Sequence, residues 1–245
     1  MTQLVLSLFP GIGLLDTAFE EEGFCVVRGP DVLWGGDIKR FHPPAGKFDG
    51  VIGGPPCQSF SSLANLLATQ GRKPRFGNLI PEFERCVREA KPTWFLMENV
   101  AKAPLPRLDG YGFAAFLLAN EALGGEQERV RRFTFGRRGG LAEDLRRYIQ
   151  PVALMLPARS RTITQQLVNN APGAKCGVRH PTVTGRHAGR QPKGGHGLAY
   201  KFPDAVRLQG LPEGFLADAP FTAEGKLRAV ANGVPLPMGR AVAKA

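Results

Sequence analysis

Short apolar strands alternate with amphipathic helices through the first hundred residues, and this order constrains the fold more than any other feature. Residues 4–9 are an apolar segment of strand length, Pro-Gly-Ile-Gly follows as a tight turn, and residues 14–22 place apolar side chains on one helix face. Three more strands and one helix are expected, at residues 24–27, 48–52, 81–90 (the helix) and 94–97. Strands that alternate with helices run parallel, so the sequence predicts an α/β fold with a doubly wound sheet.

The second half of the chain is less regular. From residue 136 to about residue 200 the apolar periodicity gives way to Arg, Gly, Pro, Thr and Asn, which predicts a small, loop-rich region. Apolar order returns after residue 201, with short helices expected at 205–209 and 238–245, the last packed back on the first part. We therefore expect one domain built from residues 1–138 and 202–245, with residues 139–201 as an insert.

The net charge of +11, from 32 basic and 21 acidic residues, is concentrated in one segment. Residues 127–200 hold 14 basic and 3 acidic side chains, whereas residues 1–126 hold 12 and 14. A basic block of this size is typical of proteins that contact phosphates, because neutralising a polyanion releases its counterions. A basic surface that serves only solubility is the alternative.

Hydropathy and cysteine spacing indicate the cellular setting. No apolar stretch approaches the roughly 20 residues that a membrane-spanning helix needs, and no basic leader precedes the first apolar run. We therefore expect a strand there rather than a signal peptide. The four cysteines show no paired spacing, which predicts free thiols in a reducing, cytoplasmic setting. Cys25, Cys86 and Cys176 are expected to fill the core.

Cys57 is different, because it follows two prolines at the end of a predicted buried strand, in Gly-Gly-Pro-Pro-Cys-Gln-Ser-Phe-Ser. Such a thiol is held at the ligand side of the sheet, where a helix or a cation favours the thiolate. Glu98-Asn99-Val100 ends another predicted strand. A carboxyl group there either caps a helix or, in an apolar cleft, is an acid with a raised pKa.

Phe-Pro-Gly-Ile-Gly at residues 9–13 suits a nucleotide-like ligand, since glycines allow close backbone approach and a helix N-terminus offers free N–H groups. It lacks the spacing of a dinucleotide site, and a plain turn remains the alternative. Asp31 and Asp37 follow the second strand and a possible third. Each is placed to accept hydrogen bonds from a ribose or an adenine amine, and surface turns are the alternative.

In combination these motifs resemble the DNA (cytosine-5)-methyltransferase family, in order along nearly the whole chain. The glycine turn resembles the family's S-adenosylmethionine turn, and the Pro-Pro-Cys segment resembles its catalytic loop. Four further segments are similar to family motifs: Glu-Asn-Val at 98–100, Gln-Glu-Arg-Val-Arg at 127–131, Arg-Leu-Gln-Gly-Leu-Pro at 207–212 and Asn-Gly-Val-Pro at 232–235. The resemblance implies a Rossmann-like methyltransferase sheet and a small target recognition domain in the basic insert.

The resemblance also implies the chemistry. Cys57 would attack C6 of a cytosine, Glu98 would hydrogen-bond or protonate N3, and Arg131 would hold O2. Arg129, from the same motif, is counted with these catalytic residues. The target base would be flipped out of double-stranded DNA, with residues 58–78 as a loop that closes over it. The residues expected at the cofactor, S-adenosylmethionine with S-adenosylhomocysteine as product, are Phe9, Gly11, Gly13, Asp31, Asp37, Ile38, Leu79, Asn232 and Gly233.

Two departures and two alternatives accompany this interpretation. The segment between Asp31 and Ile38 is too short for the family's usual helix, and residues 139–179 are short for a target recognition domain. The alternatives are cytosine in RNA as the substrate, and a DNA-binding protein on an inactive scaffold.

His180, His187 and His196 with Cys176 fit no common zinc spacing, so no metal is expected. We expect no membrane contact and no protein partner, with the monomer as the acting species, either in restriction-modification or as a solitary phage-type enzyme.

Overall fold

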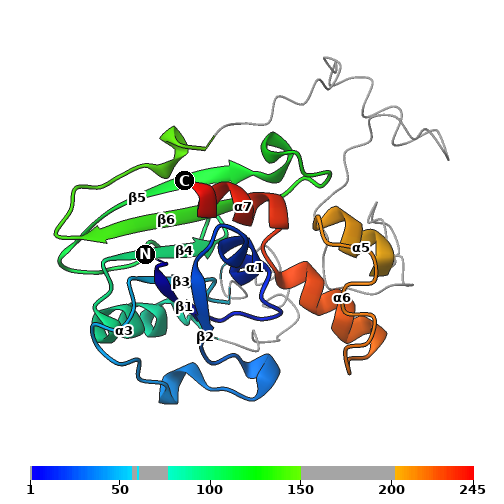
Figure 1. The fold of residues 1–245 in the computed structure, drawn as a ribbon, viewed down its shortest axis with the longest axis horizontal. Coiled ribbons are helices and arrows are strands. Elements are labelled where there is room, and N and C mark those ends of the chain that lie inside the picture. Colours follow the sequence, from blue (N-terminus) through cyan, green and yellow to red (C-terminus); the bar gives the residue numbers. More distant parts are fainter. Residues whose placement is uncertain (1, 57–59, 61–76, 150–201) are drawn as a thin grey trace.

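The computed structural model describes residues 2–56, 60, 77–149 and 202–245. Six strands form one sheet in the order β2-β1-β3-β4-β6-β5 (Figure 1). Strands β1 (Leu4–Leu8), β2 (Cys25–Arg28), β3 (Gly50–Gly53) and β4 (Trp94–Asn99) are parallel neighbours, as the sequence predicts. The predicted helices are α1 (Leu14–Glu21) and α3 (Ile80–Ala90). The α/β fold with crossover helices is confirmed for this half of the sheet.

The far side of the sheet is an antiparallel hairpin of β5 (Tyr111–Ala119) and β6 (Val130–Arg138). A 3₁₀ turn, η3 (Asn120–Leu123), begins the connection between the two strands. Strand β6 lies between β4 and β5 and runs antiparallel to both. The alternation of strands and helices in the first hundred residues does not predict that β6 runs antiparallel to its neighbours. Its effect is to place the first residues of β6 beside the last residues of β4.

No strand forms between β2 and β3 in the structure, so the possible third strand before Asp37 is wrong. Two 3₁₀ turns occupy this stretch, η1 (Val32–Trp34) and η2 (Ile38–Arg40). Asp31 caps the first by accepting a hydrogen bond from the Leu33 amide, and Asp37 caps the second by accepting one from Lys39. Two short turns capped by aspartates therefore occupy this segment, which is too short for the helix usual in the family that the sequence resembles.

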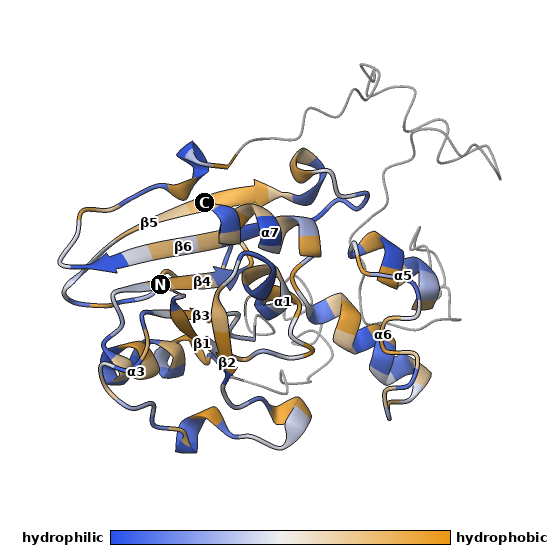
Figure 2. Ribbon diagram, in the orientation of Figure 1, coloured by the Kyte–Doolittle hydropathy of each residue, from blue (hydrophilic) through white to orange (hydrophobic). Residues whose placement is uncertain are grey.

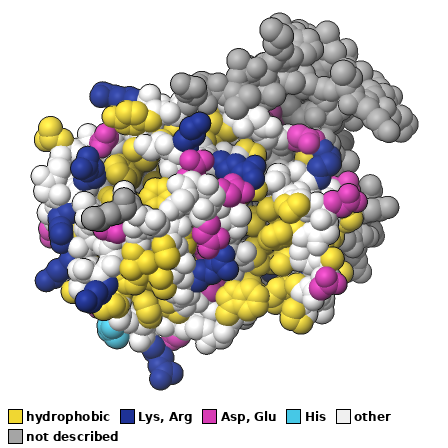
Figure 3. Space-filling model, in the orientation of Figure 1, with side chains coloured by type: hydrophobic (Ala, Val, Ile, Leu, Met, Phe, Trp, Pro, Cys, Tyr) yellow, Lys and Arg dark blue, Asp and Glu magenta, His cyan; other side chains and the backbone are white. Residues whose placement is uncertain are grey.

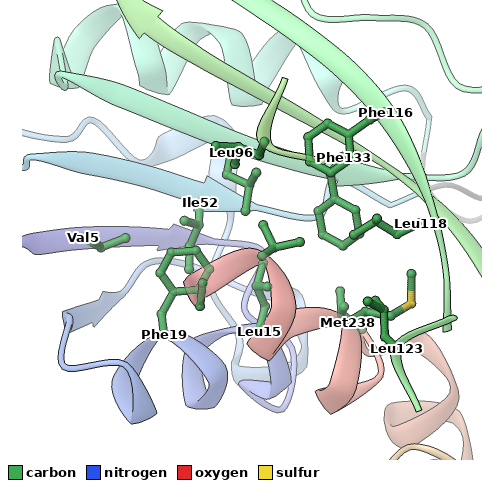
Figure 4. Packing of buried hydrophobic residues seen from close by; sticks show 14 residues of the cluster. Val5, Leu15, Phe19, Ile52, Leu96, Phe116, Leu118, Leu123, Phe133 and Met238 are labelled. Carbon is green, nitrogen blue, oxygen red and sulfur yellow. The ribbon is translucent and has the colours of Figure 1, made fainter. Parts of the chain in front are cut away.

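Strands β1, β3 and β4 are buried on both faces, which explains their continuous apolar runs (Figure 2). Side chains alternate between the faces, so Val5, Ile52 and Leu96 pack with α1 and the C-terminal helix (Figure 4). The opposite face, with Leu6, Val51 and Met97, packs with Phe83 and Val87 of α3. Two layers of helix around one sheet thus fix the edge at which the strands β1, β3 and β4 end.

Three helices complete the described chain: α5 (Phe202–Leu208), α6 (Ala223–Asn232) and α7 (Leu236–Lys244). Helices α5 and α6 stand together at one end of the sheet (Figure 1). Helix α7 lies against α1, where Gly239 approaches Ala18 closely and the Arg240 guanidinium pairs with the Glu21 carboxylate at 2.6 Å. The expected return of the C-terminal helix to the first part is confirmed.

The described cysteines divide. Cys86 is fully buried in α3, as expected, and burial raises the pKa of its thiol to about 11. Cys25 is exposed at the start of β2, so its assignment to the core is wrong. Strand β2 is the sheet's edge, and its burial pattern leaves the first residue in solvent. Among the described helices, none has the length and apolar character needed to cross a membrane.

Candidate active site

The first proline of the Pro-Pro-Cys segment is hydrogen-bonded to the end of β4. The side-chain amide of Asn99, buried in β4, donates a hydrogen bond to the Pro55 carbonyl at 3.1 Å. The Asn99 side-chain oxygen also accepts a bond from the Val100 amide at 2.8 Å. Cys57 itself lies outside the described residues. Asn99 was a candidate only as part of the Glu-Asn-Val motif, and its link to a residue 44 positions away is seen only in the structure.

Glu98 and Arg131 meet across the β4–β6 pairing. Glu98 lies opposite Phe133, and Arg131 is two residues along the same face of β6. The Arg131 Nε lies 3.0 Å from the Glu98 carboxylate, with both side chains largely buried. A Cβ added to Gly54 would lie 3.1 Å from the other Glu98 oxygen, so the loop after β3 runs close to this carboxyl group. The antiparallel reversal of β6 is what brings these two predicted residues together.

The pKa of Glu98 is raised, chiefly by burial, and the positive charges of Arg131 and Arg129 oppose this shift. No helix follows β4 in the described chain, so the helix-cap interpretation of Glu98 does not hold. A buried carboxyl group with a raised pKa beside a guanidinium is able to hold or donate a proton to a neutral, polar ligand.

Arg129 points elsewhere. Its side chain is 4% exposed and donates hydrogen bonds to the carbonyls of Ala231 and Gly233, each at 3.1 Å. These carbonyls belong to the end of α6 and the start of the Asn-Gly-Val-Pro motif. Arg129 therefore connects the segment before β6 to the C-terminal motif, and it acts on Glu98 through its charge.

The glycine turn after β1 has the expected form. Gly11 and Gly13 have φ angles of 56° and 79°, and the Gly13 amide closes the turn on the Pro10 carbonyl at 2.8 Å. The Asp31 carboxylate accepts a hydrogen bond from the Gly11 amide at 2.9 Å, which places Asp31 at this turn. The Trp34 indole donates to the Gly11 carbonyl at 2.7 Å. Trp34 was not predicted as a site residue. The one sequence feature that could have indicated it is an aromatic residue three positions after Asp31.

The remaining residues expected at the cofactor form two groups. Phe9, Ile38 and Leu79 belong to the same apolar cluster on the α3 side of the sheet. Gly233 lies against α1, where an added Cβ would be 2.4 Å from a Leu14 methyl group. Asn232 is exposed at the end of α6, and Asp37 is exposed at its turn. The structure thus brings Gly233 to the helix that begins at the glycine turn.

A buried carboxylate supports this turn from beneath. Asp16, in the first turn of α1, accepts a hydrogen bond from the Ser7 hydroxyl at 2.5 Å and pairs with the Arg28 guanidinium at 3.0 Å. Burial raises the pKa of Asp16, and the bonds from Ser7 and Arg28 oppose the shift. The Arg28 guanidinium passes over Gly13, where a Cβ would lie only 3.1 Å away. Glycine at 13 is therefore favoured by its positive φ angle, and a larger residue there would also displace the Arg28 guanidinium.

Comparison with known proteins identifies the family. The profile of the C-5 cytosine-specific DNA methylase family matches residues 35–173, more than half of the chain. The chain belongs to this family.

Among characterised relatives, the chain is 30% identical over 176 residues to the type II methyltransferase M.HgiDI of Herpetosiphon aurantiacus. This match covers 59% of the chain and 55% of the relative. It is 31% identical over 168 residues to M.NgoPII of Neisseria gonorrhoeae, covering 56% of the chain and 48% of the relative. The chain thus spans about half the length of the curated relatives it matches.

Solved structures share the fold, in matches that cover nearly the whole chain. The Dnmt2 methyltransferase of Schizosaccharomyces pombe superposes with a TM-score of 0.64 at 13% identity, covering 100% of the chain and 96% of its own. A putative DNA modification methyltransferase from an Escherichia coli prophage gives 0.60 at 16% identity, covering 99% and 98%. These likenesses confirm the Rossmann-like methyltransferase fold.

Several predicted residues fall outside the described ranges: besides Cys57 these are His180, His187, His196, Cys176, most of the 58–78 loop and the insert from residue 150 onward. Within the described ranges, no group of three or more His, Cys, Asp or Glu side chains is arranged to hold a metal ion.

Proposed function

We propose that the protein transfers a methyl group from S-adenosylmethionine to C5 of a cytosine in a specific double-stranded DNA sequence. The observation that carries this proposal is the Glu98–Arg131 pair at the end of β4, joined through Asn99 to the loop that leads to Cys57. An acid and a guanidinium at this sheet edge, with a thiol next in the sequence after Pro56, are the groups that C5 methylation of cytosine requires.

The reaction needs the cytosine ring to become nucleophilic at C5. The Cys57 thiolate adds to C6, while Glu98 shares its proton with N3 and Arg131 donates to O2, so that charge is stabilised where it develops on the ring. The raised pKa of Glu98 favours the protonated form that N3 needs. After methylation the C5 proton is lost to a base, and the Cys57 sulfur leaves C6, which restores the aromatic ring and the free thiolate.

The residues at the glycine turn fit the cofactor. A Cβ added to Gly11 would meet no atom of the described residues within 4 Å, and the N-terminus of α1 follows the turn directly. Phe9, Ile38 and Leu79 would supply apolar contacts, Asp31 and Asp37 polar ones, and Gly233 with Asn232 the opposite wall. When bound, the cofactor supplies the electrophilic methyl group.

The DNA side of the proposal uses the basic insert. A stacked base cannot reach Glu98 in its buried position, so the target cytosine is flipped out of the duplex. Residues 58–78 close over it, and residues 139–201 recognise the target sequence and hold its phosphates. The protein acts as a monomer in the cytoplasm of a bacterial or phage-infected cell.

A methyl-transfer assay with labelled cofactor tests the substrate. Duplex DNA and transfer RNA are offered separately to the wild-type protein, and mapping of methylated cytosines in an expressing host identifies the target sequence. Label in DNA at C5 of cytosine is the expected result. Label in RNA alone, or in neither, would overturn the proposal.

The covalent step has its own test. Cys57→Ser removes the thiolate but keeps the size of the side chain, so we expect DNA binding to persist and turnover to vanish. Mobility shift and label transfer on the same preparation separate the two. Wild-type protein is the control. Undiminished turnover in Cys57→Ser would rule out the covalent mechanism.

A further inference from the structure

A buried polar network joins the segment before β6 to the helices α5 and α6, and the proposed mechanism leaves it unused. Gln127 and Gln209 are both 0% exposed. The Gln127 amide donates to the Leu208 carbonyl at 2.7 Å and to the Gln209 side-chain oxygen at 3.0 Å. Two fully buried amides in an otherwise apolar junction are retained only where their hydrogen bonds are satisfied.

Gln209 passes this contact on to the end of α6. Its side-chain nitrogen donates to the Val230 carbonyl at 2.7 Å and approaches the Gly233 carbonyl at 3.5 Å, while its backbone carbonyl accepts from the Leu236 amide at 2.9 Å. The last carbonyls of a helix have no partner within the helix. Gln209 therefore supplies donors where α6 ends and supports the turn into α7.

Arg129 supplies the neighbouring donors. It bonds the carbonyls of Ala231 and Gly233, so the carbonyls of residues 230, 231 and 233 are all held by side chains from other elements. These bonds lie on both sides of Asn232, and Gly233 packs closely against Leu14 of α1. Two residues further along the strand, Arg131 contacts Glu98. One continuous set of contacts thus runs from the cofactor wall to the pair that would hold the base.

We infer that Gln209 is a positioning residue for the cofactor: its amide fixes the end of α6 so that Asn232 and Gly233 close the cofactor pocket. The inference rests on the proposed function, because it assigns a role to a wall of that pocket. Gln209 is fully buried and bonds only other parts of the chain, so its effect is expected on cofactor affinity rather than on the methyl-transfer step.

The test measures binding of S-adenosylhomocysteine by calorimetry, without DNA, to the whole chain carrying Gln209→Met. This change keeps the length of the side chain and removes its donor to the Val230 and Gly233 carbonyls and its acceptor for Gln127. Loss of buried bonds of this kind predicts a dissociation constant raised about tenfold or more. Gln3→Met is the matched control: it removes one amide acceptor, bonded to the Trp94 indole, at the opposite end of the strands, and should leave the constant within about twofold.

Steady-state kinetics on duplex DNA separate positioning from simple loss of folded protein. A positioning role raises KM for the cofactor and leaves kcat at saturating cofactor nearly unchanged, whereas partial unfolding lowers kcat alone. If Gln209→Met shows no cooperative unfolding transition, Gln209→Asn takes its place, since the shorter amide stays polar and does not reach Val230.

The outcomes are distinct. Wild-type protein that binds no S-adenosylhomocysteine would overturn the proposed function and this inference with it. Wild-type protein that binds, together with an unchanged dissociation constant in the folded variant, would overturn the inference and leave the proposed function standing.

Discussion

Two buried carboxyl groups, Asp16 and Glu98, show how this chain uses charge in its interior. Each has a pKa raised by burial, and each has an arginine at 3.0 Å that limits the shift. Asp16 also accepts from Ser7, so its bonding is directed at the structure of the glycine turn. One oxygen of the Glu98 carboxyl group contacts Arg131, and the other lies beside Gly54 in the loop after β3. The first carboxyl supports the fold, and the second is available for chemistry.

The raised pKa of Glu98 predicts a pH dependence of stability. The folded protein keeps this proton at pH values where the unfolded chain has already lost it, so unfolding releases a proton in that window. The free energy of unfolding therefore falls as pH rises from the ordinary range of a glutamate, about pH 4, through the raised value. Glu98→Gln removes this component, and urea titrations at several pH values measure it.

The control for Glu98→Gln is Glu213→Gln, at an exposed position, which should keep the wild-type slope. In the methyl-transfer assay, Glu98→Gln should also lower turnover by about 10²-fold to 10⁴-fold, the usual contribution of a general acid. A stability slope identical to wild type in Glu98→Gln would contradict the raised pKa.

At the scale of elements, apolar periodicity predicts a helix or strand correctly where the pattern of apolar residues fits only one of the two. Helices α1 and α3 and the parallel strands follow from alternating apolar runs and turn residues within a residue or two. Strand β5 was not predicted, because Tyr-Gly-Phe-Ala-Ala-Phe-Leu-Leu-Ala is apolar throughout and shows no alternation. The reversal of β6 depends on its pairing with β4, which no local pattern encodes.

The site divides in the same way. The Glu98 position, at the end of a buried strand, follows from local order, and the glycine turn follows from its residues. The roles of Asn99, Trp34 and Gln209 depend on hydrogen bonds to residues that are at least 21 positions away. Spacing alone does not distinguish Arg129 from Arg131, and only the family resemblance assigns the base contact to Arg131. The structure directs Arg129 to the C-terminal motif and Arg131 to Glu98.

Helix packing of α7 on α1 makes a prediction for a single methyl group. A Cβ at Gly239 would lie 2.8 Å from that of Ala18, closer than two carbons approach, so Gly239→Ala should lower the free energy of unfolding by about 1–3 kcal/mol. Ala18→Gly alone should cost about 1 kcal/mol through helix propensity. Together the two changes exchange the methyl group between the helices, and the double variant should recover most of the loss. Urea denaturation of all four proteins gives the cycle, and strictly additive losses would contradict the close contact.

At the scale of the molecule, the described part of the basic segment uses much of its charge internally. Arg131 pairs with Glu98, Arg137 with Glu143 and Arg146 with Asp144, while Arg132 and Arg138 donate to backbone carbonyls. On the face in Figure 3, basic and acidic side chains of the described residues are interspersed. Residues 151–200 contain seven basic side chains and no acidic one. The excess charge available to DNA is therefore expected mainly in that stretch.

This distribution predicts how DNA binding responds to charge reversal. Each phosphate contact that is lost should lower the slope of log affinity against log salt by about one. Reversal to glutamate at Arg186 or Arg190, which lie outside the described residues, or at exposed Arg147, should weaken binding strongly. Arg146 should have a smaller effect than these, because its guanidinium already bonds the Asp144 carboxylate. Lys39 and Lys91, in the nearly neutral first part, are the controls. Binding titrations on one duplex at several salt concentrations rank the six variants, and equal losses at Lys91 and Arg190 would show that net charge alone governs the affinity.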